Sequence, residues 1–130
     1  MKKWTERELK EAGYDISNAL ITSIDLSTSD HSVCVLAMGL EGNGWGSRFG
    51  NYSLGFGDMY TDIEEIDGSE IGMTYIMTLM NILESNSFID LKDKYIRVAY
   101  RKSDNATIIG HLIKDRWFDQ KSFFEDKKEE

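Results

Sequence analysis

Two neighbouring stretches in which apolar and polar residues alternate constrain the fold most strongly. They cover residues 18–26 and 31–40. A period of two indicates a β-strand, because successive side chains of a strand point to opposite faces. The turn-forming sequences STSD (27–30) and EGNG (41–44) follow the two stretches, and Asn-Gly is a strong hairpin signal. The sequence therefore predicts consecutive antiparallel strands.

A glycine-rich segment, GNGWGSRFGNYSLGFG (42–57), reads as the third strand of this meander. It lacks the lysine and the helix that a phosphate-binding loop requires, and its glycines lack the spacing of the dinucleotide fingerprint. Two interpretations remain open. Either the glycines expose backbone N–H groups to a ligand or a second chain, or they allow bulges and close packing of Trp45 over a glycine.

The second half of the chain adds one helix and further strands. Residues 70–84 predict an amphipathic helix. Its apolar face consists of Ile71, Tyr75, Ile76, Leu79, Ile82 and Leu83. A helical turn over 88–92, a strand over 95–101, a turn at Asp104-Asn105 and a strand over 107–114 follow. Strands, a helix and then more strands are typical of an α+β fold. We expect an antiparallel sheet of about five strands, with one main amphipathic helix on one face.

We expect a single domain over residues 18–118, with a polar segment at each end. Residues 1–17 form an N-terminal arm, in which Thr5-x-x-Glu8 resembles a capping box and Gly13 would end a short helix. Residues 119–130 read as an acidic C-terminal tail.

The net charge of −8 and the sequence pI of about 4.8 argue against binding to long nucleic acid, whose phosphates require neutralisation. Seven basic residues nevertheless fall between positions 92 and 116, which suits a small anion. No apolar stretch is long enough to predict a membrane span or a secretory signal. The one cysteine, Cys34, lies in an apolar run and is expected to fill space in the core.

Cations and aromatic residues on the late strands are the first candidates for ligand binding. Alternation places Tyr95, Arg97 and Arg101 on one sheet face, where arginine can bind phosphate and tyrosine can stack on a base. The same residues could form a solvated face with salt bridges to the acidic loop. Lys114 and Arg116 beside Trp117 could hold a nucleotide, or could fix the chain end and form an oligomer contact.

The residues give little support to catalysis or metal binding. His31 and His111 are the only histidines, and neither belongs to a ligand motif. No serine lies in a nucleophile elbow. The acidic run YTDIEEIDGSE (60–70) lacks the spacing of a calcium-binding loop and is typical of a solvated loop. We expect a protein that is not an enzyme and needs neither a metal nor a cofactor.

The order of these segments resembles a family of small phage proteins that includes the Thoeris anti-defence sponge proteins of the first type. The segments that carry the resemblance are GWGSRFGNYSLG, EIGMTYIMTLMNILES, LKDKYIRV and IIGHLIKDRWF. Together they cover roughly residues 18–118. The chain departs from the family pattern at Ser47-Arg48 and at Asn51, so the resemblance leaves the identity of the ligand open.

The resemblance implies a protein that sequesters cyclic ADP-ribose isomers or cyclic oligonucleotides without cleaving them. It implies a homo-oligomer, such as a dimer or hexamer, with ligand sites between subunits, in the cytoplasm of the infected bacterial host. The positions that match the family motifs are Trp45, Phe49, Gly50, Tyr52, Tyr95, Arg97, Lys114, Arg116 and Trp117. Arg48 and Arg101 complete the candidate ligand-binding set because of their place on the strands.

Two other functions compete with this one. An acidic protein can inhibit a host nuclease or another host protein, in which case the acidic residues 58–70 carry the activity. An enzyme that degrades the same signals would show turnover, whereas a sponge returns its ligand intact.

Overall fold

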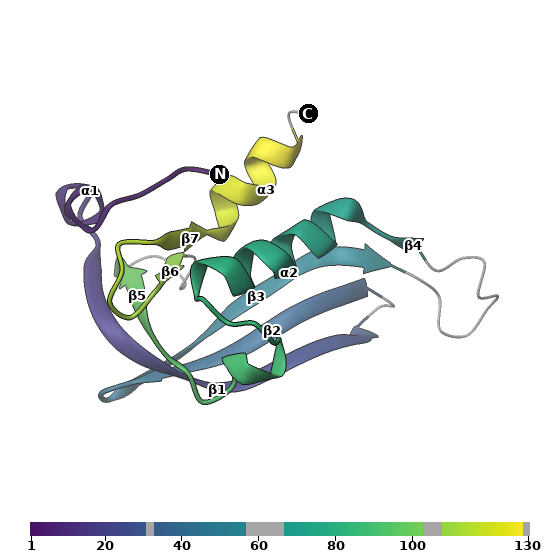
Figure 1. The fold of residues 1–130 in the computed structure, drawn as a ribbon, viewed down its shortest axis with the longest axis horizontal. Coiled ribbons are helices and arrows are strands. Elements are labelled where there is room, and N and C mark those ends of the chain that lie inside the picture. The colour runs from purple at the N-terminus through teal and green to yellow at the C-terminus, as the bar shows by residue number, and fades with distance from the viewer. Residues whose placement is uncertain (31–32, 57–66, 103–107, 129–130) are drawn as a thin grey trace.

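A computed structural model describes residues 1–30, 33–56, 67–102 and 108–128 and shows an α+β fold (Figure 1). Seven antiparallel strands form one sheet in the order β4-β3-β2-β1-β5-β6-β7. The strands are β1 (Asp15–Asp30), β2 (Val33–Gly42), β3 (Trp45–Phe56), β4 (Asp67–Gly68), β5 (Tyr95–Tyr100), β6 (Ile108–Gly110) and β7 (Trp117–Asp119). The helices are α1 (Glu6–Glu11), α2 (Glu70–Ile82) and α3 (Gln120–Lys128), with a 3₁₀ turn, η2, at Ile89–Leu91. The α+β prediction is confirmed, although the sheet has more strands and the fold more helices than expected.

The predicted meander forms β1, β2 and β3. The Asn-Gly turn joins Gly42 to Trp45 as register partners, and Gly44 has the positive φ of +80° that such a turn requires. The turn expected at 27–30 is wrong, because β1 continues as a strand to Asp30. Pairing between β1 and β2 overrides the local turn propensity there, and this pairing continues as far as Asp30 of β1, which lies opposite Val33 of β2.

Glycines in β3 and at the end of β2 are required where a side chain would collide with neighbouring atoms. Gly50 has a φ of +115°, and a Cβ at this position would collide with the backbone carbonyl of Leu36. The register of β2 against β3 shifts at this point, which marks a bulge. A Cβ on Gly42 would collide with the indole of Trp45. The interpretation based on bulges and on packing of Trp45 over a glycine is confirmed at both positions.

Helix α2 covers one face of the sheet (Figure 1). Its N-cap is Ser69, whose hydroxyl accepts a hydrogen bond from the Gly72 N–H at 2.9 Å. Tyr75 and Leu79 are fully buried against the sheet, as the apolar periodicity predicts. Ile71 is 38% exposed, because Gly72 occupies the contact with the sheet, where its backbone lies against the carbonyl of Leu54.

The C-terminal part differs most from expectation. The predicted strand over 107–114 is wrong in its extent: β6 ends at Gly110, and the chain turns back through residues 111–116 into β7. The segment expected to be an acidic tail forms α3, and its Phe123 and Phe124 lie in the core. Two adjacent aromatic residues in a charged helix explain this, since each buries a large apolar area.

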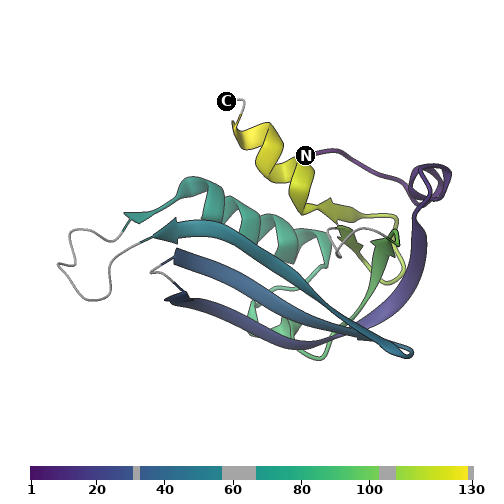
Figure 2. The ribbon, with the colours of Figure 1, turned by 180° about the vertical axis from the view of Figure 1, so that it is seen from behind.

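The N-terminal arm covers part of the opposite sheet face. The predicted capping box at Thr5 and Glu8 is present, and Gly13, with a φ of +92°, follows the helix end. Leu9 of α1 is fully buried in a second cluster with Ala99, Ile108 and Trp117. This cluster lies at one end of the sheet only. Seen from behind, the long strands β1 to β3 carry no helix of the described chain on this outer face (Figure 2).

Candidate functional site

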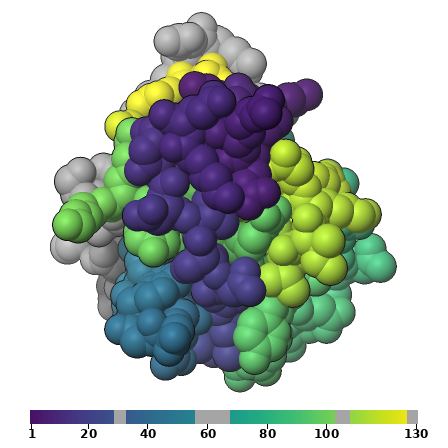
Figure 3. Space-filling model, turned by 90° about the vertical axis from the view of Figure 1, so that its left-hand side faces the viewer, coloured from purple at the N-terminus to yellow at the C-terminus, as the bar shows by residue number. Residues whose placement is uncertain are grey.

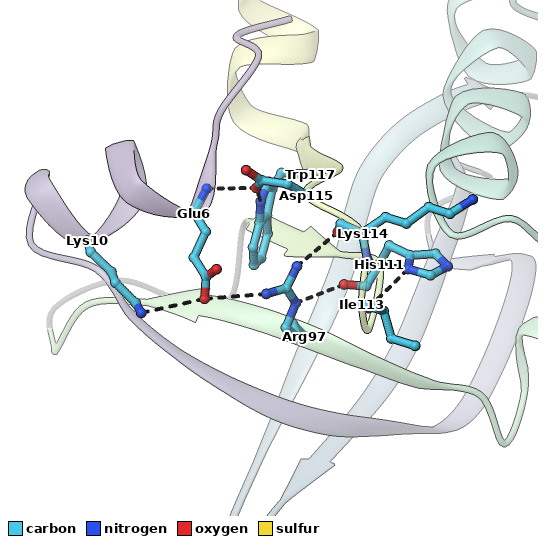
Figure 4. A network of polar contacts seen from close by, with 8 residues as sticks. All are labelled: Glu6, Lys10, Arg97, His111, Ile113, Lys114, Asp115 and Trp117. Carbon is cyan, nitrogen blue, oxygen red and sulfur yellow. Dashed lines mark hydrogen bonds and ion pairs between the residues drawn. The ribbon is translucent and has the colours of Figure 1, made fainter.

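Arg97 is the centre of a polar network that joins three segments (Figure 4). Its Nε donates to the carbonyl of His111 at 2.9 Å, and its Nη2 donates to the carbonyl of Lys114 at 2.9 Å. Its Nη1 lies 3.4 Å from Glu6 Oε1 in α1. The guanidinium also covers the Trp117 ring at 4.7 Å. With a side chain only 12% exposed, Arg97 holds the chain together and offers few free donors to a ligand.

His111 organises the turn between β6 and β7. Its Nδ1 accepts hydrogen bonds from the backbone N–H groups of Ile113 and Lys114, at 3.1 and 2.9 Å. Its Nε2 lies 3.1 Å from Glu84 Oε2. This arrangement requires the neutral imidazole with the proton on Nε2. Burial lowers the pKa of His111, and the positive charge of Lys114 adds to this effect while Glu84 opposes it.

Two of the other predicted cations in this region also have intramolecular partners. Lys114 Nζ lies 2.7 Å from Glu84 Oε1, and this hydrogen bond is the main reason why the pKa of Glu84 is lowered. Arg116 Nη2 donates to Asn81 Oδ1 at 2.6 Å. Both contacts tie the turn to the C-terminal end of α2.

Arg101 fixes the other end of the arm. Its guanidinium lies 4.1 Å from the centre of the Tyr14 ring, and its Nη1 donates to the carbonyl of Ala12 at 3.4 Å. Arg97 and Arg101, the pair expected on one sheet face, therefore both bind the N-terminal arm to β5.

Most of the predicted aromatic residues pack inside the protein. Phe49 is buried in the main core, Tyr52 stacks on Phe124 at 4.4 Å between ring centres, and Trp117 is buried beneath Arg97. The indole of Trp45 lies over Gly42. Tyr95 is different, because its side chain is 61% exposed on the outer face.

An open hollow of about 740 Å³ lies on the outer face at the β2–β3 hairpin. Arg48 and Trp45 border it from β3, and Glu41 borders it from β2. Arg48 stands opposite Gly39, and Glu41 stands opposite Gly46, in the register of the two strands. Each charged residue therefore faces a glycine across the hairpin, and the glycines leave the space between the charges open.

Hydroxyl groups of β1 border the same hollow. Thr22 and Ser23 lie at a bulge where β1 pairs with β2. Ser23 Oγ accepts a hydrogen bond from the Gly39 N–H at 3.1 Å, which leaves its own O–H available to a ligand. The hollow thus combines a guanidinium, hydroxyl groups and glycine backbone, a set that suits a phosphate, with the Glu41 carboxylate at its border.

A second hollow of about 350 Å³ adjoins the first (Figure 3 shows the hairpin, in blue, beside β1). Tyr95, Asn18 and Leu20 line it, and Glu41 and Gly42 border both hollows. Tyr95 is therefore an exposed aromatic residue that a base could reach, next to the hollow that Arg48 borders.

The structure separates the predicted site residues, and Phe49, Gly50 and Tyr52 are packed inside the protein. Trp45, Arg48 and Tyr95 lie at the paired hollows, whereas Lys114, Arg116, Arg97 and Trp117 lie at the turn 111–116 and Arg101 lies at the arm. Residues that the sequence interpretation missed are Asn18, Thr22, Ser23 and Glu41. The alternation of β1 and β2 places some of them on the face away from the core. It does not indicate whether another segment packs on that face.

No family model matches the chain, and neither the curated proteins nor the solved structures include a match. No described helix has the length and apolar character needed to cross a membrane.

Proposed function

We propose that this protein binds a small nucleotide-derived signal in the paired hollows and sequesters it without cleavage, as a phage anti-defence protein. The observation that supports this proposal best is the state of Arg48. It is exposed, borders the larger hollow, and has no ion pair or hydrogen bond within the described residues, whereas Arg97, Arg101, Lys114 and Arg116 all have partners.

In this proposal Arg48 binds a phosphate, with help from the hydroxyl groups of Thr22 and Ser23. A guanidinium can form two parallel hydrogen bonds to phosphate, and the glycine backbone beneath it permits close approach. The base stacks on Tyr95 in the smaller hollow. The family resemblance and the acidic net charge support a small anion over long nucleic acid.

The ligand classes proposed are cyclic ADP-ribose isomers and cyclic oligonucleotides, bound in the cytoplasm of the infected host. The hollows are open to solvent on one side, so a second subunit of a homo-oligomer would close them over the ligand. Size-exclusion chromatography coupled to light scattering, with and without ligand, measures the number of subunits directly.

A ligand-retention assay tests the proposal. The protein is mixed with cyclic ADP-ribose isomers and with cyclic di- and trinucleotides, and its melting temperature is measured. A ligand at 100 times its dissociation constant stabilises the protein by about 2.7 kcal/mol. Heat denaturation should release the ligand, and mass spectrometry should show that it is intact. Cleaved product would show an enzyme instead, and the absence of any shift would contradict the proposal.

Two variants locate the site in this assay. Arg48→Ala should weaken binding by about 10- to 100-fold, the usual cost of a charged hydrogen bond. Gly46→Val should weaken binding more strongly than Arg48→Ala, because the valine side chain would fill part of the hollow that Gly46 lines. It should keep the fold, since a Cβ at Gly46 meets only ordinary contact with the Leu40 carbonyl at 3.7 Å and valine favours strands. Lys121→Ala, on α3 and away from the hollows, is the control.

An acidic protein that inhibits a host nuclease or another host protein remains the second candidate, supported by the net charge of −8. It predicts that neutralising the acids between positions 58 and 70, most of which lie outside the described residues, abolishes function while Arg48→Ala does not. Arg97→Ala cannot separate the two functions, because its loss would disturb the fold.

A further inference from the structure

The outer face carries a row of register partners that crosses four strands. Gly46 of β3 is opposite Glu41 of β2, Glu41 is opposite Leu20 of β1, and Leu20 is opposite Tyr95 of β5. Neighbouring strands lie about 4.8 Å apart, so Glu41 lies roughly two strand spacings from Tyr95. Arg48 is two residues beyond Gly46 on β3 and is thus a diagonal neighbour of Glu41, at about 7–8 Å between Cα atoms.

Glu41 is therefore placed between the cation and the exposed aromatic residue. It borders both hollows, whereas Arg48 borders only the larger one and Tyr95 only the smaller one. Its side chain is exposed and forms no ion pair or hydrogen bond within the described part of the chain. At neutral pH the carboxylate can only accept hydrogen bonds, and it repels a second anion.

A nucleotide has the same order of chemical groups. The ribose lies between the phosphate and the base, and its hydroxyl groups donate hydrogen bonds. A carboxylate that accepts from ribose hydroxyls is an established mode of nucleotide recognition. With the phosphate on Arg48 and the base on Tyr95, the ribose would lie beside Glu41.

We propose that Glu41 is a specificity-determining residue that binds a free ribose hydroxyl of the ligand. This inference depends on the proposed nucleotide function and refines it. The protein selects ribonucleotides with a free 2′-hydroxyl, discriminates against 2′-deoxy analogues, and rejects ligands that carry an additional phosphate at that oxygen.

Isothermal titration with a matched pair of probes tests this role. The probes are 3′,5′-cyclic diadenosine monophosphate and its bis(2′-deoxy) analogue, each titrated into the wild-type protein and into Glu41→Ala. The wild-type protein should bind the ribose form about 10- to 100-fold more tightly, since a hydrogen bond to a charged group is worth this factor. Glu41→Ala should reduce that ratio to about 1.

A third variant and a second probe separate charge from hydrogen bonding. Glu41→Gln keeps an acceptor without the negative charge, so it should keep part of the preference for ribose. It should also improve binding of a 2′-phosphorylated analogue, cyclic ADP-ribose 2′-phosphate, relative to cyclic ADP-ribose. The control Lys121→Ala, on α3 and away from the hollows, should leave all ratios unchanged.

The outcomes distinguish the two proposals. If a ribose probe binds and Glu41→Ala leaves the ratio of ribose to deoxy affinity unchanged, the role of Glu41 is wrong and the nucleotide function stands. If none of the probes binds the wild-type protein, both proposals fail together. Circular dichroism should confirm that each variant keeps the wild-type fold, as expected for an exposed residue without partners among the described residues.

Discussion

At the scale of single residues, the environment of each side chain decides whether it supports structure or binding. Arg97 and Arg48 both lie on strands, and the sequence analysis predicted that both bind a ligand. Arg97 donates to two carbonyl groups and contacts Glu6, whereas Arg48 has no such partner within the described residues. The number of donors that remain free, and not the residue type, separates the two roles.

His111 makes a prediction at the same scale. Its Nδ1 accepts hydrogen bonds from two backbone N–H groups. A proton added to Nδ1 would point at these two donors, and both hydrogen bonds would be lost. The pKa of His111 is lowered in the folded protein, so the unfolded chain binds the proton first. Stability that is present above the unfolded pKa of about 6.5 should therefore be lost as the pH falls below that value.

Melting temperatures of matched variants between pH 8 and pH 5 measure this effect. His111→Asn places an acceptor near Nδ1 and cannot be protonated, so its melting temperature should fall less over this range than that of the wild type. His111→Gln, which lacks that acceptor, should be less stable at every pH. An equal slope in the wild type and in His111→Asn would contradict the prediction. The lowered pKa of Glu84 acts only below its ordinary value of 4.5, which keeps the two effects apart.

At the scale of elements, α3 shows that a polar segment can carry core residues. Phe123 and Phe124 contact Tyr75 of α2, with ring centres 5.8 and 5.3 Å apart. Gln120, at the start of the helix, accepts a hydrogen bond from the buried Tyr75 hydroxyl at 2.9 Å. The helix thus closes the end of the main core and is part of the fold.

Phe123→Ala should lower the free energy of unfolding by about 3–5 kcal/mol, the usual cost of removing a buried aromatic side chain. Urea denaturation followed by circular dichroism measures it. The control is Lys121→Ala on the exposed side of the same helix, which should change stability by less than about 0.5 kcal/mol. A small effect of Phe123→Ala would mean that α3 is not docked in solution.

At the scale of the whole molecule, the N-terminus lies beside α3, the last helix of the chain (Figure 1). The amino group of Met1 forms an ion pair with Asp126, and the Lys2 N–H donates to Ser122 Oγ at 2.8 Å. Trp4 Nε1 donates to Asp119 Oδ2 at 2.9 Å. The N-terminal arm therefore links the cluster on the outer face to α3 on the other side.

These links predict one cooperative unfolding transition. Trp4 reports on the arm, and Trp45 lies against the main core. Two variants that each retain one of these tryptophans, with the others replaced by phenylalanine, should give the same urea midpoint by fluorescence as by circular dichroism. An earlier transition at Trp4 would show that the arm detaches before the sheet unfolds.

Elements whose signals are local could be predicted from the sequence. The alternation of β1 and β2, the Asn-Gly turn, the capping box of α1 and the apolar period of α2 each arise from short-range geometry, and the structure contains all four. The length of β6 and the helical structure of the C-terminal segment were not predicted correctly. Both depend on partners that are distant in sequence: β6 pairs with β5 and β7, and Phe123 packs in the main core.

Which residues are exposed and available to a ligand depends on how distant segments pack, and the sequence did not predict it. Alternation assigns Arg97 and Tyr95 to the same face of β5, but the N-terminal arm covers one and leaves the other exposed. Glu41 and Arg48 lie opposite glycines because the two-residue Asn-Gly turn sets this register, but the turn does not determine whether another segment covers them. Solvent exposure depends on which distant segment packs on a face, and the candidate site lies where no described segment does.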